Sequence, residues 1–141
     1  MTTFVYQQLE FSLPDDWNGN VVQDTPDVVP RAMIGPRDES RYEECVVQLS
    51  GHDFGQPVRT PALREIMVRQ GRWTPAGIRE YTIGPWSGVG TELADGEVKY
   101  LSLFLGVGTT ALFLLFSAPM MWYDIHRGTL WSILESVRVR S

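Results

Sequence analysis

The sequence predicts an α+β fold in which a central antiparallel sheet of six or seven strands carries two main helices. Short apolar segments separated by Pro and Gly recur along the chain, which is typical of strands joined by turns. Asp95-Gly96 lies between two of these segments and favours a tight hairpin. Two other segments repeat apolar residues at helical spacing. With 141 residues, of which 43% are hydrophobic, the chain is expected to form a single domain over residues 1–141.

The first third of the chain is predicted to contain four strands. Leu9, Phe11 and Leu13 alternate with other residues, a pattern that buries one face of a strand. Turn-forming residues follow from Pro14 to Asn20, and we expect a loop there with Trp17 exposed. A charged turn separates the last two strands. The expected strands cover residues 3–6, 9–13, 28–34 and 43–49.

A helix is expected to begin at Thr60-Pro61. The Thr side chain can cap the first free backbone amides, and Pro is tolerated at the first helical position. Gly71 is well placed to end this helix. Three apolar residues fall on one helical face, so the helix is expected to pack on a sheet: Leu63, Ile66 and Met67.

The second half is predicted to form a meander of four antiparallel strands and a closing helix. The expected strands cover residues 78–83, 89–93, 98–105 and 111–116, with the Asp95-Gly96 hairpin between the second and third. After Pro119, apolar residues recur at spacings of three and four, which predicts an amphipathic helix: Leu130, Ile133, Leu134 and Val137.

One uncharged segment has two interpretations. No residue from Tyr100 to Trp122 is charged, and 23 residues are enough to cross a bilayer as a helix. Gly106 and Gly108 interrupt this segment, however, and Pro119 ends it. We expect two strands joined by a Gly-rich turn, because strands buried on both faces also read as continuous apolar sequence. The prediction is a water-soluble chain with no membrane partner.

The negative charge is concentrated in the first third of the chain. The formal net charge is −5, and nine acidic residues but only three basic ones precede Gly51. Such a surface repels phosphate backbones and attracts basic protein surfaces. The sequence therefore predicts a protein partner with a basic surface and no nucleic acid.

No residues with the spacing of a catalytic site emerge from the sequence. His52 lies close to Ser50 and Asp53, but neighbours in sequence rarely converge as a catalytic triad does, and a turn at a strand end is expected there. His126 is expected at the surface or at a helix cap. Cys45 is the only cysteine, and its apolar neighbours predict a buried, unreactive thiol. The single cysteine and the lack of a secretory signal indicate a cytoplasmic protein.

Metal and cofactor sites are not expected either. The chain has only three His and Cys residues, which lie far apart, whereas zinc sites need three or four protein ligands. Gly106 to Ala111 matches the pattern G-x-G-x-x-A of dinucleotide-binding turns. The apolar residues that follow have no polar face, so a hairpin is expected there and no dinucleotide cofactor.

Both ends of the sequence resemble the PsbP-like and DcrB-like superfamily. Phe11 to Trp17 is similar to the opening motif F-x-L-P-x-x-W. The ending is similar as well, because an apolar strand over Leu112 to Ser117 leads into Ala118-Pro119 and then a helix that closes with Ile133 to Val137. The resemblance implies a central antiparallel sheet flanked by helices, an α/β/α sandwich, and a binding protein without catalytic activity.

The leading functional hypothesis is an immunity protein, a cytosolic inhibitor that occludes the active site of a bacterial polymorphic toxin delivered by type VI secretion or by contact. Two alternatives remain open: a DcrB-like chaperone for a type VI secretion effector, and a small-molecule enzyme that uses Cys45 or His52. The oligomeric state is also open. The candidate partner-binding residues are Asp15, Asp16, Trp17, Asp38, Glu39 and Glu43.

Overall fold

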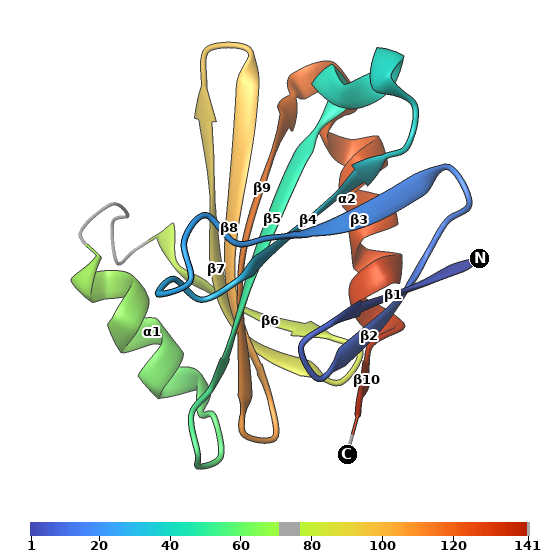
Figure 1. Cartoon of the computed structure of the whole chain (residues 1–141). Coiled ribbons are helices and arrows are strands. Elements are labelled where there is room, and N and C mark those ends of the chain that lie inside the picture. The colour runs from blue at the N-terminus through green and yellow to red at the C-terminus, as the bar shows by residue number, and fades with distance from the viewer. Residues whose placement is uncertain (71–76, 141) are drawn as a thin grey trace.

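The computed structural model describes residues 1–70 and 77–140. Its elements follow one another along the chain (Figure 1) as β1 (Thr2–Tyr6), β2 (Leu9–Leu13), β3 (Trp17–Val22), β4 (Arg31–Pro36), the 3-10 helix η1 (Glu39–Glu44), β5 (Val46–Asp53), α1 (Thr60–Arg69), β6 (Arg79–Ile83), β7 (Trp86–Asp95), β8 (Val98–Val107), β9 (Thr110–Pro119), α2 (Met120–Glu135) and β10 (Arg138–Val139).

The strands form a large sheet and a small one. The seven-stranded sheet has the order β3-β4-β5-β9-β8-β7-β6, and all its neighbouring strands are antiparallel. The strands from β6 to β9 form the predicted meander, while β5 pairs with β9 and thereby joins β3 and β4 to it. The small sheet has the order β1-β2-β10. The predicted α+β class with a seven-stranded antiparallel sheet and two main helices is confirmed.

One face of the large sheet, the covered face, is buried beneath α2 and the small sheet. Leu103 and Leu114 face each other across β8 and β9, and both contribute to the core beneath α2. Leu130 and Leu134 from α2 and Leu9 from the small sheet belong to the same core. Burial of this apolar area is the main stabilising contribution of the fold.

In the part of the chain that the structure describes, a helix covers one corner of the opposite face, the open face. There α1 places Leu63 and Met67 against Val89, Phe104 and Ala111. The two helices therefore lie on opposite sides of the sheet, as in an α/β/α sandwich. The rest of the open face has no helix over it in the part of the chain that the structure describes (Figure 1).

The uncharged segment forms two strands and the start of a helix. Strands β8 and β9 pair in register from Val98↔Pro119 to Val107↔Thr110, and Gly108 adopts a φ of 58° in the turn between them, which favours glycine. The prediction of two strands is confirmed. Among the described residues, no helix is both long enough and apolar enough to cross a membrane.

Two predicted elements in the first third are displaced. The strand expected over residues 28–34 is β4 at Arg31–Pro36, and the strand expected over 43–49 begins only at Val46 because η1 occupies the preceding residues. The loop expected from residue 14 to 20 is wrong, since β3 begins at Trp17. Gly19 permits this strand, because a Cβ added there would lie 2.7 Å from the ring of Phe4.

Helix α1 begins at the predicted residue without the predicted cap. Arg59 occupies the N-cap position, and no side chain caps the helix there, so the prediction of a Thr60 cap is wrong. Leu63 and Met67 are buried as expected. Gly71, the predicted end of the helix, lies outside the described residues.

Candidate functional site

The acidic residues predicted to bind a partner gather on adjoining segments. The turn between β2 and β3 is tied to the segment before η1 because the Arg37 amide donates a hydrogen bond to the Asp16 carbonyl at 2.7 Å. The Arg41 guanidinium of η1 also pairs with the Asp16 carboxylate at 3.0 Å. The exposed acids of these two segments are Asp15, Asp16, Asp38, Glu39 and Glu43.

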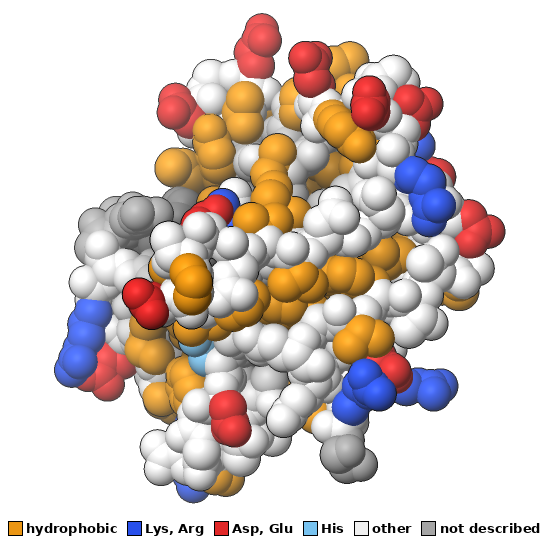
Figure 2. Space-filling model, in the orientation of Figure 1, with side chains coloured by type: hydrophobic (Ala, Val, Ile, Leu, Met, Phe, Trp, Pro, Cys, Tyr) orange, Lys and Arg blue, Asp and Glu red, His pale blue; other side chains and the backbone are white. Residues whose placement is uncertain are grey.

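Two further segments bring acidic residues to the same end of the molecule. The tip of the β7–β8 hairpin carries the exposed Asp95 and Glu97, and the Met120 amide donates to the Glu97 carbonyl at 2.8 Å, so the hairpin lies against the start of α2. Asp124 is exposed on α2. We call the region formed by these residues, the β2–β3 turn and η1 the acidic end. Figure 2 shows Asp and Glu side chains around this upper end.

The acids of η1 differ in their surroundings. The Asp38 carboxylate accepts a hydrogen bond from the Ser40 amide at 2.9 Å, which lowers the pKa of Asp38. Glu39 and Glu43 are exposed, and among the residues that the structure describes neither forms an ion pair. These two carboxylates are therefore available to a partner.

Trp17 does not lie where the sequence predicted. It is the first residue of β3, only 1% exposed, and its ring lies 5.7 Å from the ring of His126. The prediction of an exposed Trp17 is wrong, because the residue belongs to a strand whose alternation turns its side chain toward α2. In this structure Trp17 is a core residue that packs against His126 beneath the acidic end.

His126 and Glu44 form a buried polar contact between α2 and η1. Nε2 of His126 lies 2.7 Å from Oε1 of Glu44, and their side chains are only 3% and 12% exposed. The His126 ring stacks on Trp122 with ring centroids 5.7 Å apart. The prediction that His126 lies at the surface or at a cap is wrong, since α2 begins at Met120 and places this residue on its inner face.

Arg41 and burial shift the pKa values of Glu44 and Cys45 beside this contact. The Arg41 side chain donates two hydrogen bonds to Glu44, at 3.0 and 3.2 Å, and these bonds hold the pKa of Glu44 below its usual value. Burial raises the pKa of the adjacent Cys45 thiol to about 12. The predicted burial of Cys45 is confirmed, and its thiol stays protonated at neutral pH.

Ser50 and His52 lie on a strand rather than in the expected turn. Both belong to β5, where residues two apart share a face, and Oγ of Ser50 lies 2.8 Å from Nε2 of His52. Burial lowers the pKa of His52. The Asp53 carboxylate instead accepts a hydrogen bond from the Gly55 amide at 2.9 Å. Its side chain points to the other side of the strand, so the three residues are not arranged as a triad.

The remaining sequence motifs have structural roles. The G-x-G-x-x-A pattern beginning at Gly106 forms the β8–β9 turn and continues as a strand, as the sequence predicted. In residues 1–70 and 77–140, no three His, Cys, Asp or Glu side chains are placed so that they could hold a metal ion.

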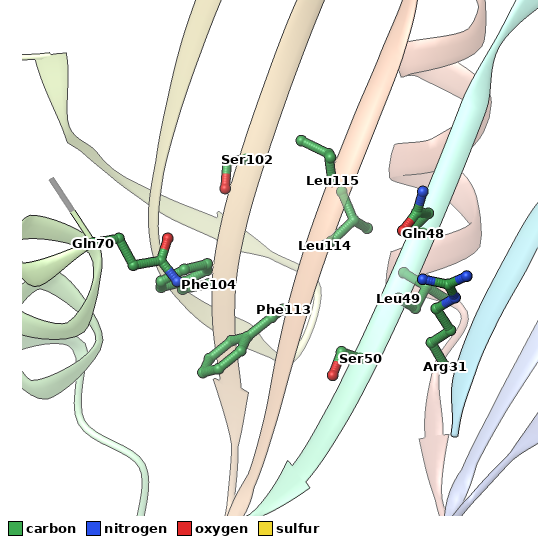
Figure 3. Close-up of a pocket in the computed structure, with 10 residues that line it drawn as sticks. All are labelled: Arg31, Gln48, Leu49, Ser50, Gln70, Ser102, Phe104, Phe113, Leu114 and Leu115. Atoms are coloured by element: carbon green, nitrogen blue, oxygen red, sulfur yellow. The ribbon is translucent and has the colours of Figure 1, made fainter. Parts of the chain in front are cut away.

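The open face presents a second, very different surface. Across β4, β5, β9 and β8, the side chains that point to this face include a single charged residue, Arg31. Figure 3 shows Gln48, Leu115 and Ser102 side by side on three neighbouring strands. They line a hollow of about 210 Å³ that ends at Arg31 on one side and at Gln70, the residue after α1, on the other.

The seven-stranded antiparallel sheet with helices on both faces has a PsbP-like α+β fold. The solution structure of cyanobacterial PsbP from Synechocystis is similar, with a TM-score of 0.52 and 11% identity over 98% of this chain and 91% of that chain. A crystal structure from Bacteroides thetaiotaomicron has a TM-score of 0.63 and 14% identity and covers 99% of this chain.

This chain spans only 48% of the Bacteroides protein, about half its length. LpqN, involved in cell envelope biogenesis of Mycobacterium tuberculosis, has a TM-score of 0.47 and 14% identity over 94% of this chain and 83% of that chain. Comparison with protein-family models gives no match, and curated protein sequences give none either. At these identities the Bacteroides and Synechocystis structures establish the fold alone.

Proposed function

We propose that this chain is a protein-binding domain without catalytic activity, an immunity protein that neutralises a bacterial toxin by covering its active site. The single observation that carries the proposal is the acidic end, where carboxylates from the β2–β3 turn, η1, the β7–β8 hairpin and α2 gather. Such an inhibitor acts in the cytoplasm and needs no cofactor, nucleic acid or membrane.

Electrostatics supply the physical reason. Toxins that cleave nucleic acids or bind phosphate groups have basic clefts, and a cluster of carboxylates on rigid segments speeds the encounter with such a cleft. Glu39 and Glu43 are exposed and unpaired among the described residues, so a basic partner gains their charge without breaking an existing ion pair. Inhibition by charge complementarity is expected to weaken as salt concentration rises.

Co-expression tests this proposal. The chain is expressed with the toxin domain encoded by the neighbouring reading frame, and both cell survival and complex formation are measured. The wild-type chain is expected to protect, whereas the variant Glu39→Lys/Glu43→Lys is expected to lose protection. Asp27→Lys/Glu80→Lys is the matched control, because it changes the net charge equally at exposed sites outside the acidic end. Absence of both protection and a complex with the wild-type chain would refute the proposal.

A second candidate function is favoured by the open face. A DcrB-like chaperone for a type VI secretion effector would shield apolar segments of its client, and such a task suits a sheet surface with few charged side chains. Val46 and Leu115 are 41% and 39% exposed on this face. These two side chains offer apolar contact with a client.

Pull-down experiments separate the two functions. A chaperone binds the N-terminal apolar segment of the effector and loses it in the variant Val46→Ser/Leu115→Ser. An immunity protein binds the toxic C-terminal domain and retains binding in that variant. Binding of the toxic domain alone therefore excludes the chaperone.

A further inference from the structure

Helix α2 leaves an apolar stripe exposed on its outer face. Met121 is 77% exposed and Ile125 is 61% exposed, although α2 already buries a full apolar face that includes Leu130 and Leu134. Gly128 and Ser132 continue the stripe, so its four members follow one another at spacings of four, three and four. This is the spacing at which one helix presents a seam to another.

The two halves of this outer stripe differ in shape. Met121 and Ile125 project large side chains, and the flexible methionine adapts to the surface that it meets. A Cβ added to Gly128 would meet no atom within 4 Å, and the Ser132 hydroxyl donates back to the Gly128 carbonyl at 3.3 Å. The second half therefore carries no large side chain, which allows the backbone of another helix to come close.

The charges beside the stripe are negative. Asp124 and Glu135 are exposed on α2, eleven residues apart and hence on the same flank. Arg127 points away from the stripe, because its guanidinium lies 4.2 Å from the centre of the Trp131 ring and 3.6 Å from Glu92. The stripe also begins beside Glu97 of the acidic end. A partner suited to this surface is apolar along one line and basic on the flank that faces Asp124 and Glu135.

We propose that the outer face of α2 binds an amphipathic helix of the partner protein. The apolar side of that helix covers Met121 and Ile125, and its Lys or Arg residues pair with Asp124, Glu135 and the acidic end. This inference rests on the proposed function and specifies the partner's secondary structure. A second copy of this chain is a poor occupant, because a symmetric contact would bring acidic flanks together in a chain of net charge −5.

A synthetic peptide tests the proposal directly. The probe is a fluorescent amphipathic helix with Leu at spacings of three and four and Lys on one flank, and binding is measured by anisotropy. The wild-type chain is expected to bind it, while the variant Met121→Ser/Ile125→Ser is expected to lose at least about tenfold in affinity. Val68→Ser is the control, because Val68 is an exposed apolar residue, 37% exposed, on the other helix.

Three results would overturn the proposal. A scrambled peptide of the same composition would bind equally well, or Met121→Ser/Ile125→Ser would leave affinity unchanged although circular dichroism shows it to be folded. The third is a concentration-dependent dimer that Ile125→Ser dissociates in sedimentation measurements, since the occupant would then be a second copy.

The same variants separate this inference from the proposed function. If Glu39→Lys/Glu43→Lys abolishes protection from the toxin while Met121→Ser/Ile125→Ser retains it, inhibition stands and the helix-binding face is wrong. If the peptide binds at Met121 and Ile125 but no toxin is neutralised, the binding face stands and the proposed function is wrong.

Discussion

The acidic end and the open face both present exposed side chains, yet the residues of the two regions are held in place differently. At the acidic end, exposed carboxylates stand above a buried assembly in which Trp17, Glu44 and His126 join three segments. On the open face, Val46 and Leu115 lie on paired strands and are 41% and 39% exposed. Substitutions beneath the acidic end are therefore expected to affect both stability and binding, whereas substitutions on the open face are expected to affect binding alone.

The largest difference between the two regions is expected for their apolar residues. Trp17→Ala is expected to lower the free energy of unfolding by about 3–5 kcal/mol, because it removes a large side chain from the core and leaves a cavity. Leu115→Ala, on the open face, is expected to cost well under about 1 kcal/mol. Urea denaturation measures both values. Equal losses would show that the open face is packed against something in solution.

The next largest effect concerns the buried polar contact. Glu44→Ala is expected to cost about 1–3 kcal/mol, because it leaves His126 without its hydrogen-bond partner in the interior. Glu43→Ala changes the exposed neighbouring residue and is expected to stay within about 0.5 kcal/mol. Thiol labelling of Cys45 adds a local measurement, since loosening of η1 would raise the labelling rate. If Cys45 is labelled as slowly in Glu44→Ala as in the wild-type chain, Glu44 does not hold η1 in place.

A pH titration gives a smaller effect with a defined sign. The pKa of Glu44 is lower in the folded chain than in the unfolded chain, chiefly because of Arg41. The unfolded state therefore binds the proton first, and stability that is complete above about pH 5 is lost as the pH falls through the folded pKa. Denaturation between pH 3 and pH 7 measures this loss, which is expected to be shallower in Glu44→Gln. Identical slopes would contradict the assignment.

The smallest effect on stability is expected on the open face. Val46→Ser/Leu115→Ser is expected to change the free energy of unfolding by no more than about 0.5 kcal/mol for each residue, since both side chains already contact water. The same variant is expected to bind less of a hydrophobic dye. A large destabilisation would show that this face is buried in the folded protein, for example by association.

The sequence predicted the fold better than the site. Local signals such as Asp95-Gly96 and the alternation in Leu9–Leu13 depend on neighbouring residues, and the structure confirms the hairpin and the strand. The burial of Trp17 and His126 depends on contacts across more than one hundred residues of sequence, and no local pattern reports such contacts. The exposed stripe on α2 had a usable signal, because Met121, Ile125, Gly128 and Ser132 recur at helical spacing.

The sequence predicted only part of the charge of the acidic end, again because the rest depends on long-range contacts. Composition revealed the excess of acids before Gly51, but not that the β7–β8 hairpin would add Asp95 and Glu97 to the same region. Which end of the sheet a hairpin reaches depends on strand order, and the pairing of β5 with β9 is a long-range choice. Acids far apart in sequence meet only because of that pairing.

The pairing of β5 with β9 also affects when, during synthesis, the chain can bind its partner. Strand β5 is translated before its partner strand β9, and η1 acquires its neighbour His126 later still. In a ribosome-bound chain whose α2 has not yet been synthesised, the acidic residues of η1 are therefore present before the contact between Glu44 and His126 can form. Recognition of the partner is expected to await the last helix, so a nascent chain stalled before Met120 should leave the partner unbound.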